Sequence, residues 1–244
     1  MFPLHILNTR PRNQAALLTS KLQSLGCRVT EYPLFEIVPY TMNLATDVSD
    51  TLHYDVIICT SVNAITHSLP WFTRLRAKHF VAAGQATYEA LRAQGVNNAH
   101  IPSPCGSTGI LTLPCLASPD PGRVLILTGQ NSPPYLSQTL IQRGADITII
   151  PTYTRVPNTK PLVLQKQPDL AIVTSKQGLK QLTTHVATNA FSLLDIPLIV
   201  VTKAMRKLAI DCGFSDTILV TDRVSNHAIL ETLNQHMTQL KERL

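Results

Sequence analysis

The chain is poor in the features that mark several large protein classes. Only 5% of its 244 residues are aromatic, and no Lys/Arg cluster is interleaved with aromatic side chains, so no base-stacking platform or phosphate-tracking helix for nucleic acid is visible. No apolar run approaches the roughly 18 residues of a membrane helix, and the first residues lack the pattern of a signal peptide. These absences predict a cytoplasmic protein that binds neither nucleic acid nor membrane.

Disulfide and metal-binding patterns are also missing. The five cysteines show no CxxC spacing and lie in or beside apolar segments, as reduced thiols do. The eight histidines lack HxxxH and HxH spacing, so a metal site would need ligands gathered from distant segments. We therefore expect neither a disulfide framework nor a bound metal.

What the chain does contain is an internal repeat. Residues that end helices and strands recur in the same order about 118 positions later. The pairs are Pro33 and Pro151, Gly95 and Gly213, and Ser107 and Ser225. Ser61 and Ser175 are 114 positions apart, which a short loop insertion or deletion explains. Any α/β protein repeats strand, turn and helix, but agreement in order and spacing over both halves favours duplication of one unit.

Each half alternates strands and helices in the manner of a doubly wound α/β fold. An apolar strand at 4–7 or 124–127 leads into a helix-period stretch that ends at Gly26 or Gly144, the expected left-handed position. A β-branched strand follows, and this β–α–β order requires a parallel sheet. The nearly continuous apolar runs DVIICTS and DLAIVTS are typical of strands buried on both faces. We predict doubly wound parallel sheets, which bind ligands beyond the carboxyl ends of their strands.

Two short proline-containing segments lie at equivalent places in the repeat. They are FEIVPYT at 35–41 and YTRVPNT at 153–159, and their prolines suit edge or connector strands rather than central ones. We interpret them as a pair of linker strands between domains. The predicted division is a first domain of 1–34 and 161–244, a second domain of 42–152, and linkers at 35–41 and 153–160.

The predicted strand ends carry small and hydroxyl residues rather than a catalytic motif. No nucleophile elbow, P-loop, GxGxxG or pair of carboxylates is found there. Such residues expose backbone N–H groups at helix N-termini, which makes anion sites, and the net charge of +6 favours an anionic partner. The alternatives are plain helix capping and a generic basic surface. The residues are Thr9, Thr60, Ser61, Asn63, Gly84, Thr87, Ser107, Thr128, Gly129, Thr174 and Ser175.

Seven segments form an ordered set over nearly the whole chain. They are ILNTRPRNQ, LGCRVTEYPLFEIVP, DVIICTSVNAI, AAGQATYEALRAQG, RVLILTGQN, LIQRGADITIIPTYTRV and SKQGL. In order and spacing this set resembles the uroporphyrinogen-III synthase family. The resemblance implies two flavodoxin-like domains joined by a two-stranded linker, with no metal or organic cofactor. It also implies a lyase that cyclises hydroxymethylbilane, an octacarboxylate, in haem biosynthesis.

In the reaction that this resemblance implies, the last pyrrole ring is inverted through azafulvene and spiro intermediates. Such a route asks the protein mainly to fold the substrate and stabilise charge, so an obvious acid–base pair is not required. We expect a monomer, with a transient contact to hydroxymethylbilane synthase as a further interaction.

The resemblance assigns two candidate catalytic residues. Tyr153 matches a hinge tyrosine that acts as an acid or hydrogen-bond donor to the departing hydroxyl, since a phenol keeps its proton at neutral pH. Thr87 matches a G-x-x-T turn that faces the cleft. The alternatives are a tyrosine packed in a linker and a helix cap. The candidate substrate-binding residues are Arg10, Ser61, Asn63, Gly84, Ser107, Gly129, Ser175, Lys176 and Lys203.

The second half departs from the family pattern where it should mirror that turn. Thr202 and Met205 replace the glycine and the threonine. Lys176, Lys203 and Arg206 come to strand ends instead, and we expect their cations to take over part of the carboxylate binding.

Two other functions stay open on the residues. One is a two-domain binding or sensor protein that closes on a polyanionic metabolite without chemistry, since a fold alone does not determine function. The other is a nucleotide- or sugar-handling transferase. The missing Gly-rich phosphate loop and the lack of a ribose-binding carboxylate disfavour the transferase.

Overall fold

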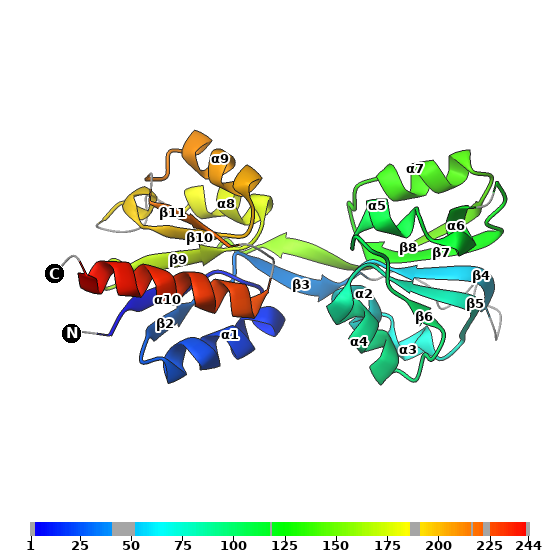
Figure 1. The fold of residues 1–244 in the computed structure, drawn as a ribbon, viewed down its shortest axis with the longest axis horizontal. Helices are drawn as coiled ribbons and strands as arrows, with labels where there is room; N and C mark the ends of the chain where they lie inside the picture. The colour runs from blue at the N-terminus through cyan, green and yellow to red at the C-terminus, as the bar shows by residue number, and fades with distance from the viewer. Residues whose placement is uncertain are drawn as a thin grey trace. The chain divides into compact units, whose positions relative to one another are not determined.

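The structure is a computed structural model that describes residues 3–40, 52–117, 119–185, 191–215, 217–221 and 225–242. Its contacts divide the chain into two units: unit 1 is Met1–Glu36 with Val156–Leu244, and unit 2 is Ile37–Arg155 (Figure 1). The predicted boundary between residues 41 and 42 lies outside the described residues. In the part of the chain that the structure describes, no helix has the length and apolar character needed to cross a membrane.

Unit 1 is built around five parallel strands in the order β11-β10-β9-β1-β2. The strands are β1 (His5–Asn8), β2 (Arg28–Glu31), β9 (Leu170–Val173), β10 (Leu198–Val200) and β11 (Ile218–Val220). The helices are α1 (Arg12–Ser24), α8 (Lys176–Thr183), α9 (Lys203–Asp211) and α10 (Asn226–Glu242), with a 3-10 turn at Leu193–Asp195. Helices α1 and α10 cover one face of the sheet, and α8 and α9 cover the other (Figure 1).

Unit 2 contains a sheet in the order β3-β8-β7-β4-β5-β6. Its strands are β3 (Phe35–Pro39), β4 (Leu52–Cys59), β5 (Leu75–Ala82), β6 (Ala99–His100), β7 (Arg123–Gly129) and β8 (Asp146–Pro157). Helices α2 (Val62–Thr66), α3 (Leu69–Phe72) and α4 (Gln85–Ala93) cover one face. Helices α5 (Ser107–Ile110), α6 (Pro114–Ala117) and α7 (Tyr135–Gln142) cover the other. The predicted doubly wound α/β class is confirmed.

The five strands of the unit 1 sheet have counterparts in the same order in the unit 2 sheet. Ile6 on β1 pairs with Leu170 on β9, and Val124 on β7 pairs with Val56 on β4. Ile6 and Val124 are 118 positions apart, and their partners Leu170 and Val56 are 114 positions apart, the two offsets seen in the sequence repeat. Replacing β1, β2, β9, β10 and β11 by β7, β8, β4, β5 and β6 converts the strand order of unit 1 into that of five strands of the unit 2 sheet, to which β3 adds a sixth beside β8. Each unit therefore combines the first part of one repeat with the last part of the other.

The core explains why the strand sequences are apolar without interruption. Ile57 packs toward α2, α3 and α4, whereas its neighbour Ile58 packs toward α5, α6 and α7, and both are fully buried. Burial of each such side chain is worth about 1.5–3 kcal/mol. Helices α1 and α7 are followed by Gly26 and Gly144 with φ of 81° and 89°, which confirms the predicted left-handed ends.

Strand β8 differs from its counterpart in the first repeat. There, Pro33 separates β2 from β3, whereas β8 runs unbroken through Pro151. The sequence pattern suggests two segments here, a strand ending at Pro151 and a separate linker strand, and the structure has one. A register shift at β7, where Thr128 pairs with Pro151 and Gly129 pairs with Tyr153, accompanies the passage of the proline. The consequence is that Tyr153 belongs to the strand that borders β7.

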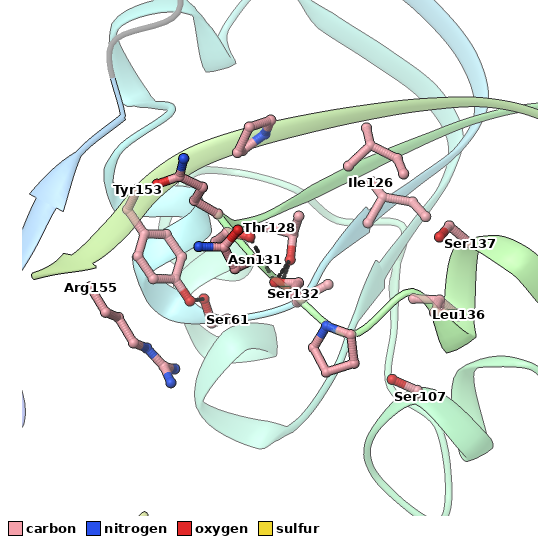
Figure 2. Close-up of a pocket in the computed structure, with 16 residues that line it drawn as sticks. Ser61, Ser107, Ile126, Thr128, Asn131, Ser132, Leu136, Ser137, Tyr153 and Arg155 are labelled. Carbon is pink, nitrogen blue, oxygen red and sulfur yellow. Dashed lines mark hydrogen bonds between the residues drawn. The ribbon is translucent and has the colours of Figure 1, made fainter. Parts of the chain in front are cut away.

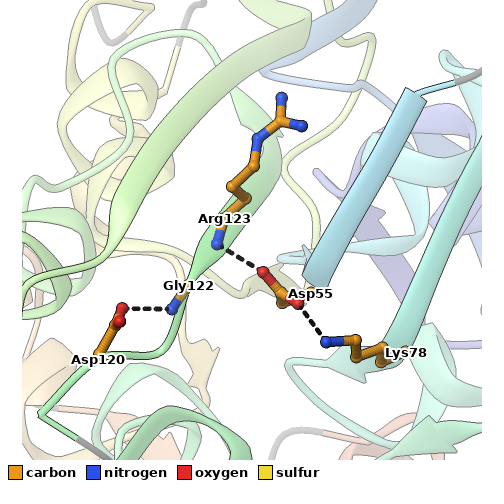
Figure 3. A network of polar contacts seen from close by, with 5 residues as sticks. All are labelled: Asp55, Lys78, Asp120, Gly122 and Arg123. Atoms are coloured by element: carbon orange, nitrogen blue, oxygen red, sulfur yellow. Dashed lines mark hydrogen bonds and ion pairs between the residues drawn. The ribbon is translucent and has the colours of Figure 1, made fainter.

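In both sheets an aspartate carboxylate accepts a hydrogen bond near the amino end of a neighbouring strand. In unit 2 the Asp55 carboxylate accepts a hydrogen bond from the Arg123 backbone N–H at 2.9 Å and pairs with Lys78 Nζ at 2.8 Å (Figure 3). In unit 1 the Asp169 carboxylate accepts from the His5 backbone N–H at 2.7 Å. The two aspartates occupy equivalent positions of the repeat. This contact joins neighbouring strands in both units and belongs to the fold.

Candidate functional site

A pocket of about 370 Å³ lies in unit 2, at the carboxyl ends of β4 and β7 and along β8 (Figure 2). Strands β4 and β7 are neighbours whose following helices cover opposite faces of the sheet. Such a switch point is where doubly wound sheets bind ligands, and the volume lies within the range of small-molecule sites. Lining residues that bear on function are Ser61, Ser107, Gly129, Ser132, Tyr153 and Arg155.

Tyr153 brings a hydroxyl group to the pocket wall. Its side chain is only 4% exposed, and its Oη accepts a hydrogen bond from Ser61 Oγ at 3.1 Å. Ser61 is the N-cap of α2, and its Oγ also accepts from the Ala64 N–H at 3.2 Å. Because Ser61 supplies the hydrogen of its bond to the phenol, the phenol's own hydrogen is available to a ligand. One serine thus starts a helix and orients a donor.

Gly129 makes room for this phenol. A Cβ atom added at Gly129 would lie 2.7 Å from Cζ and 3.0 Å from Oη of Tyr153. Those separations are well below normal carbon contact distances of about 3.5–4.0 Å, so a larger residue would displace the ring. The glycine is needed here for the approach of a side chain.

A hydroxyl group holds the backbone of Gly129, and two more adjoin it. Ser132 Oγ donates to the Gly129 carbonyl at 2.7 Å, and it lies 2.6 Å from Thr128 Oγ1. Thr60 Oγ1 lies 3.0 Å from Thr128 Oγ1 and 3.1 Å from the Leu127 carbonyl oxygen, and its one hydrogen goes to one of the two. Since each hydroxyl carries one hydrogen, the bond from Ser132 to the carbonyl makes Thr128 the donor to Ser132. Thr128 and Ser132 lie close together in the pocket wall (Figure 2).

The charge of the pocket favours an anion. Arg155 and Tyr153 are the ionisable side chains in its lining, and no carboxylate is among the lining residues. Cys59 ends the strand just before the pocket, but burial raises the pKa of its thiol to about 12. A thiol that stays protonated is a poor nucleophile, so the pocket offers hydrogen-bond donors and a cation.

The described residues give no evidence of a metal centre among carboxylates, thiols and imidazoles. No group of three or more His, Cys, Asp or Glu side chains in those ranges could hold a metal ion.

Four predicted site residues line this pocket: Tyr153, Ser61, Ser107 and Gly129. Three others from unit 2 do not, and each has a structural place. Asn63 and Thr87 are buried in the first turns of α2 and α4, with exposures of 4% and 6%, and Gly84 is the N-cap of α4. Burial places the side chains of Asn63 and Thr87 in the interior of unit 2 rather than in the pocket wall.

Arg10, a predicted substrate-binding residue, belongs to unit 1. Its guanidinium donates to the Asn226 side-chain oxygen and, at 3.2 Å, to Gln14 Oε1. Burial lowers the pKa of the guanidinium from its ordinary value. The arginine thereby links the turn after β1 to the start of α10.

The remaining predicted residues of unit 1 mark helix starts. Ser175 and Thr202 cap α8 and α9, each accepting a hydrogen bond from the backbone N–H three residues later, at 2.9 and 3.2 Å. Lys176 and Lys203 are the exposed first residues of these helices. Met205, the departure from the family pattern, is 3% exposed and packs in the core. The altered turn thus has a capping threonine and a core methionine.

Sequence reasoning missed Arg155 and Ser132. Arg155 had a usable signal, because residues two apart on a strand share a face and Tyr153 is two positions earlier. Ser132 had none, because its position follows from a turn in which Asn131 adopts a φ of 60°.

A family model matches most of the chain. The model described as uroporphyrinogen-III synthase HemD covers residues 17–231. The chain belongs to the uroporphyrinogen-III synthase family. The resemblance inferred from the sequence motifs is confirmed, and so is the prediction of an enzyme rather than a non-catalytic binding protein.

Curated relatives carry the same family name. The uroporphyrinogen-III synthase of Escherichia coli K12 is 28% identical over 246 residues, covering 94% of this chain and 100% of the relative. That of Salmonella typhimurium LT2 is 28% identical over 256 residues with the same coverage. These names indicate uroporphyrinogen-III synthase activity and a place in haem biosynthesis.

Solved structures support the fold. A mutant uroporphyrinogen III synthase from the extreme thermophile Thermus thermophilus gives a TM-score of 0.64 at 12% identity, covering 97% of this chain and 99% of that one. The Helicobacter pylori 26695 enzyme gives 0.64 at 17% identity, covering 95% and 99%. The agreement extends over both units of the chain.

Proposed function

We propose that this chain cyclises hydroxymethylbilane with inversion of the last pyrrole ring, and that the unit 2 pocket receives the end of the substrate that bears the hydroxymethyl group. The observation that carries the proposal is the Ser61–Tyr153 pair. It supplies a buried phenol that accepts one hydrogen bond and keeps its own hydrogen for a ligand. The pocket around it has a cation and no carboxylate in its lining, which suits a substrate with eight carboxylates.

In the first step, Tyr153 donates its proton to the departing hydroxyl. The carbon–oxygen bond of the hydroxymethyl group breaks and water leaves. The lone pair of the pyrrole nitrogen stabilises the remaining methylene as an azafulvene cation. Ser61, already donating to the phenol oxygen at 3.1 Å, stabilises the negative charge that forms there. A positioned proton donor of this kind contributes roughly 10²–10⁴-fold in rate.

In the second step, the substituted carbon of the last ring attacks the azafulvene methylene to form a spiro intermediate. The bond from that carbon to its old methylene bridge then breaks, and the bridge rejoins the ring at its free position. Loss of a proton from that position restores aromaticity, and return of a proton to the phenolate restores Tyr153. The protein contributes mainly by holding the two ends of the bilane close together.

We propose that Arg155 pairs with one substrate carboxylate near the pocket, and that Arg10, Ser175, Lys176 and Lys203 contact others. Arg155 is favoured because it lies two residues from Tyr153 on β8 and lines the pocket. If both lysines bind carboxylates, replacing Lys176 and Lys203 together by Ala raises the KM for hydroxymethylbilane. An unchanged KM removes them from the binding site.

The test of the proposed reaction is the isomer of the product. Hydroxymethylbilane generated freshly by its synthase is supplied to the full chain, and the uroporphyrinogen isomers are separated after oxidation. We expect type III in excess of the type I that arises by spontaneous closure. Type I alone would overturn the proposal.

We further propose that the enzyme works as a cytoplasmic monomer without a cofactor, in transient contact with hydroxymethylbilane synthase. Supporting this, the described helices include none able to span a membrane. Sedimentation of the purified chain, alone and with the synthase, distinguishes a monomer from a dimer and detects the contact.

A further inference from the structure

Two histidine side chains meet on neighbouring strands of unit 2, apart from the residues that line the pocket. His79 lies on β5 and His100 on β6, with Nδ1 of His79 3.0 Å from Nε2 of His100. The ring centroids are 5.1 Å apart. The reaction proposed above uses neither residue. We propose that this histidine pair chelates one divalent transition-metal ion that prefers nitrogen ligands and right-angled coordination, namely Cu²⁺ or Ni²⁺.

The strands hold the pair in advance of any metal. Val81 on β5 pairs with His100 on β6, and the Val81 side chain is fully buried. Just before β6, the Asn98 side chain donates to the carbonyls of Ala77 and Lys78 on β5, at 3.2 and 2.8 Å. These bonds fix the separation of the two strands on which the imidazoles stand. A site that is already formed loses little conformational entropy when it binds.

The distance between the two nitrogens selects the class of ion. Imidazole nitrogens bind first-row divalent metals at about 2.0–2.1 Å. Two nitrogens 3.0 Å apart can both reach that distance from one ion when the angle at the ion is close to a right angle. Square-planar and tetragonal Cu²⁺ and Ni²⁺ offer such angles, whereas tetrahedral Zn²⁺ requires wider ones. Mg²⁺ prefers oxygen ligands and serves as the negative control.

The protons balance without an external acid or base. In the metal-free hydrogen bond, one of the two facing nitrogens carries the hydrogen and the other accepts it. On binding, both facing nitrogens give their lone pairs to the metal, and the hydrogen moves to the other nitrogen of the same ring. Within the described ranges no third His, Cys, Asp or Glu joins the pair, so water completes the coordination. His100 is exposed, which gives the ion access.

The experiment is a calorimetric titration of the full chain with CuCl₂ or NiCl₂, and with MgCl₂, in a buffer that does not bind metals. The variants are His79→Ala and His100→Ala. The control His53→Ala removes another exposed histidine of the same sheet, and Cys105→Ser removes the exposed thiol. For Cu²⁺, electron paramagnetic resonance counts the imidazole nitrogens bound to the ion.

We expect the wild type and both controls to bind one Ni²⁺ or Cu²⁺ with two nitrogen ligands from imidazole, and to bind no Mg²⁺. Each single histidine variant should lose at least tenfold in affinity for this ion. The metal-induced rise in Tm should shrink in the same variants, because only binding to the folded state stabilises it. A loss smaller than tenfold in either histidine variant, or a comparable loss in a control, overturns the proposal.

Discussion

Each unit has its own sheet, and five strands have the same order and register in both. The two units differ in the residues beyond one pair of equivalent strands. Ser61 in unit 2 and Ser175 in unit 1 occupy equivalent positions, and both cap a helix through the N–H three residues later. At the position equivalent to Tyr153, unit 1 has Phe35, which packs against the core of its own unit. At the position equivalent to Gly129, unit 1 has Pro11. The comparison separates what every copy of this fold needs from what only the proposed reaction needs.

Tyr153→Phe places in unit 2 the residue that unit 1 already has, and we expect the largest effect from it. The kcat for type III product should fall by about 10²–10³-fold because the proton donor is lost, while KM changes little. The ring remains, so the free energy of unfolding should fall by no more than about 1.5 kcal/mol, the value of a hydrogen bond. Rates and isomers are measured chromatographically. Phe35→Tyr is the reciprocal variant and should gain no activity; a kcat of Tyr153→Phe near wild type would contradict the role of the phenol.

Gly129→Ala tests whether the approach of glycine to phenol matters. The added Cβ would lie 2.7 Å from the Tyr153 ring, so the ring must move, and we expect kcat to fall at least tenfold. Overpacking of this kind costs about 1–3 kcal/mol of stability. Gly84→Ala is the matched control, because an added Cβ there would first meet an atom at 4.0 Å. Equal effects of the two substitutions on kcat would show that the close approach is not specific.

Ser61→Ala and Ser175→Ala divide the capping role from the chemical role. Each should lower the free energy of unfolding by about 1 kcal/mol through loss of an N-cap. Only Ser61→Ala should also lower kcat, by several-fold, because only Ser61 donates to a phenol. Urea denaturation and steady-state kinetics measure the two effects. Ser61→Thr, which keeps a hydroxyl, should recover both, and a lower kcat in Ser175→Ala would break the distinction.

A fall in pH should lower the stability of the two units in different pH ranges. Of the four predictions, we expect the smallest effect from this one. In unit 1, burial lowers the pKa of His5 and of His185. The folded state then binds fewer protons than the unfolded chain, so their contribution is complete above the ordinary histidine pKa of 6.5 and declines as pH falls below it. In unit 2, the hydrogen bond from Lys78 and the Arg123 backbone N–H lower the pKa of Asp55. Its contribution is present above the ordinary carboxyl range and is lost as pH falls through the lowered pKa.

Hydrogen exchange resolved by peptide, corrected for intrinsic rates, measures this difference between pH 7 and pH 5. We expect exchange to rise in unit 1 before unit 2. His5→Gln should reduce the rise in unit 1, while Asp55→Asn should leave it unaltered. Equal sensitivity of both units in this range would contradict the assignment.

The fold was largely readable from the sequence because the repeat left its trace in two offsets. In the sheets the offset of 118 relates Ile6 to Val124, and the offset of 114 relates their strand partners Leu170 and Val56. The site was readable only in part. Ser61 follows the end of β4 and Tyr153 lies within β8, and both line the pocket, whereas Thr87 carries a matching motif and is buried in a helix. Motif position on a helix does not reveal which way a first-turn side chain faces.

Other features of the site depend on backbone geometry that composition does not encode. The register shift at Gly129 brings that residue opposite Tyr153, and no pattern of apolar residues predicts it. The bond of Ser132 to the Gly129 carbonyl depends on the following turn with Asn131 at a φ of 60°. Both follow from how β7 ends, which is decided by tertiary contacts.

Each unit combines parts of both repeats, and this arrangement has a consequence for folding during translation. Unit 2 is one continuous segment, 37–155, whereas β1 of unit 1 must pair with β9, so that Ile6 meets Leu170. During synthesis from the N-terminus, unit 2 leaves the ribosome complete while β1 and β2 still lack their central partner. Domains fold as units when their chain is available, so unit 2 can fold first. Residues 37–155, which separate β1 from β9 in the sequence, are then a folded domain instead of a long flexible loop. Folding of unit 2 therefore precedes and aids the pairing of β1 with β9.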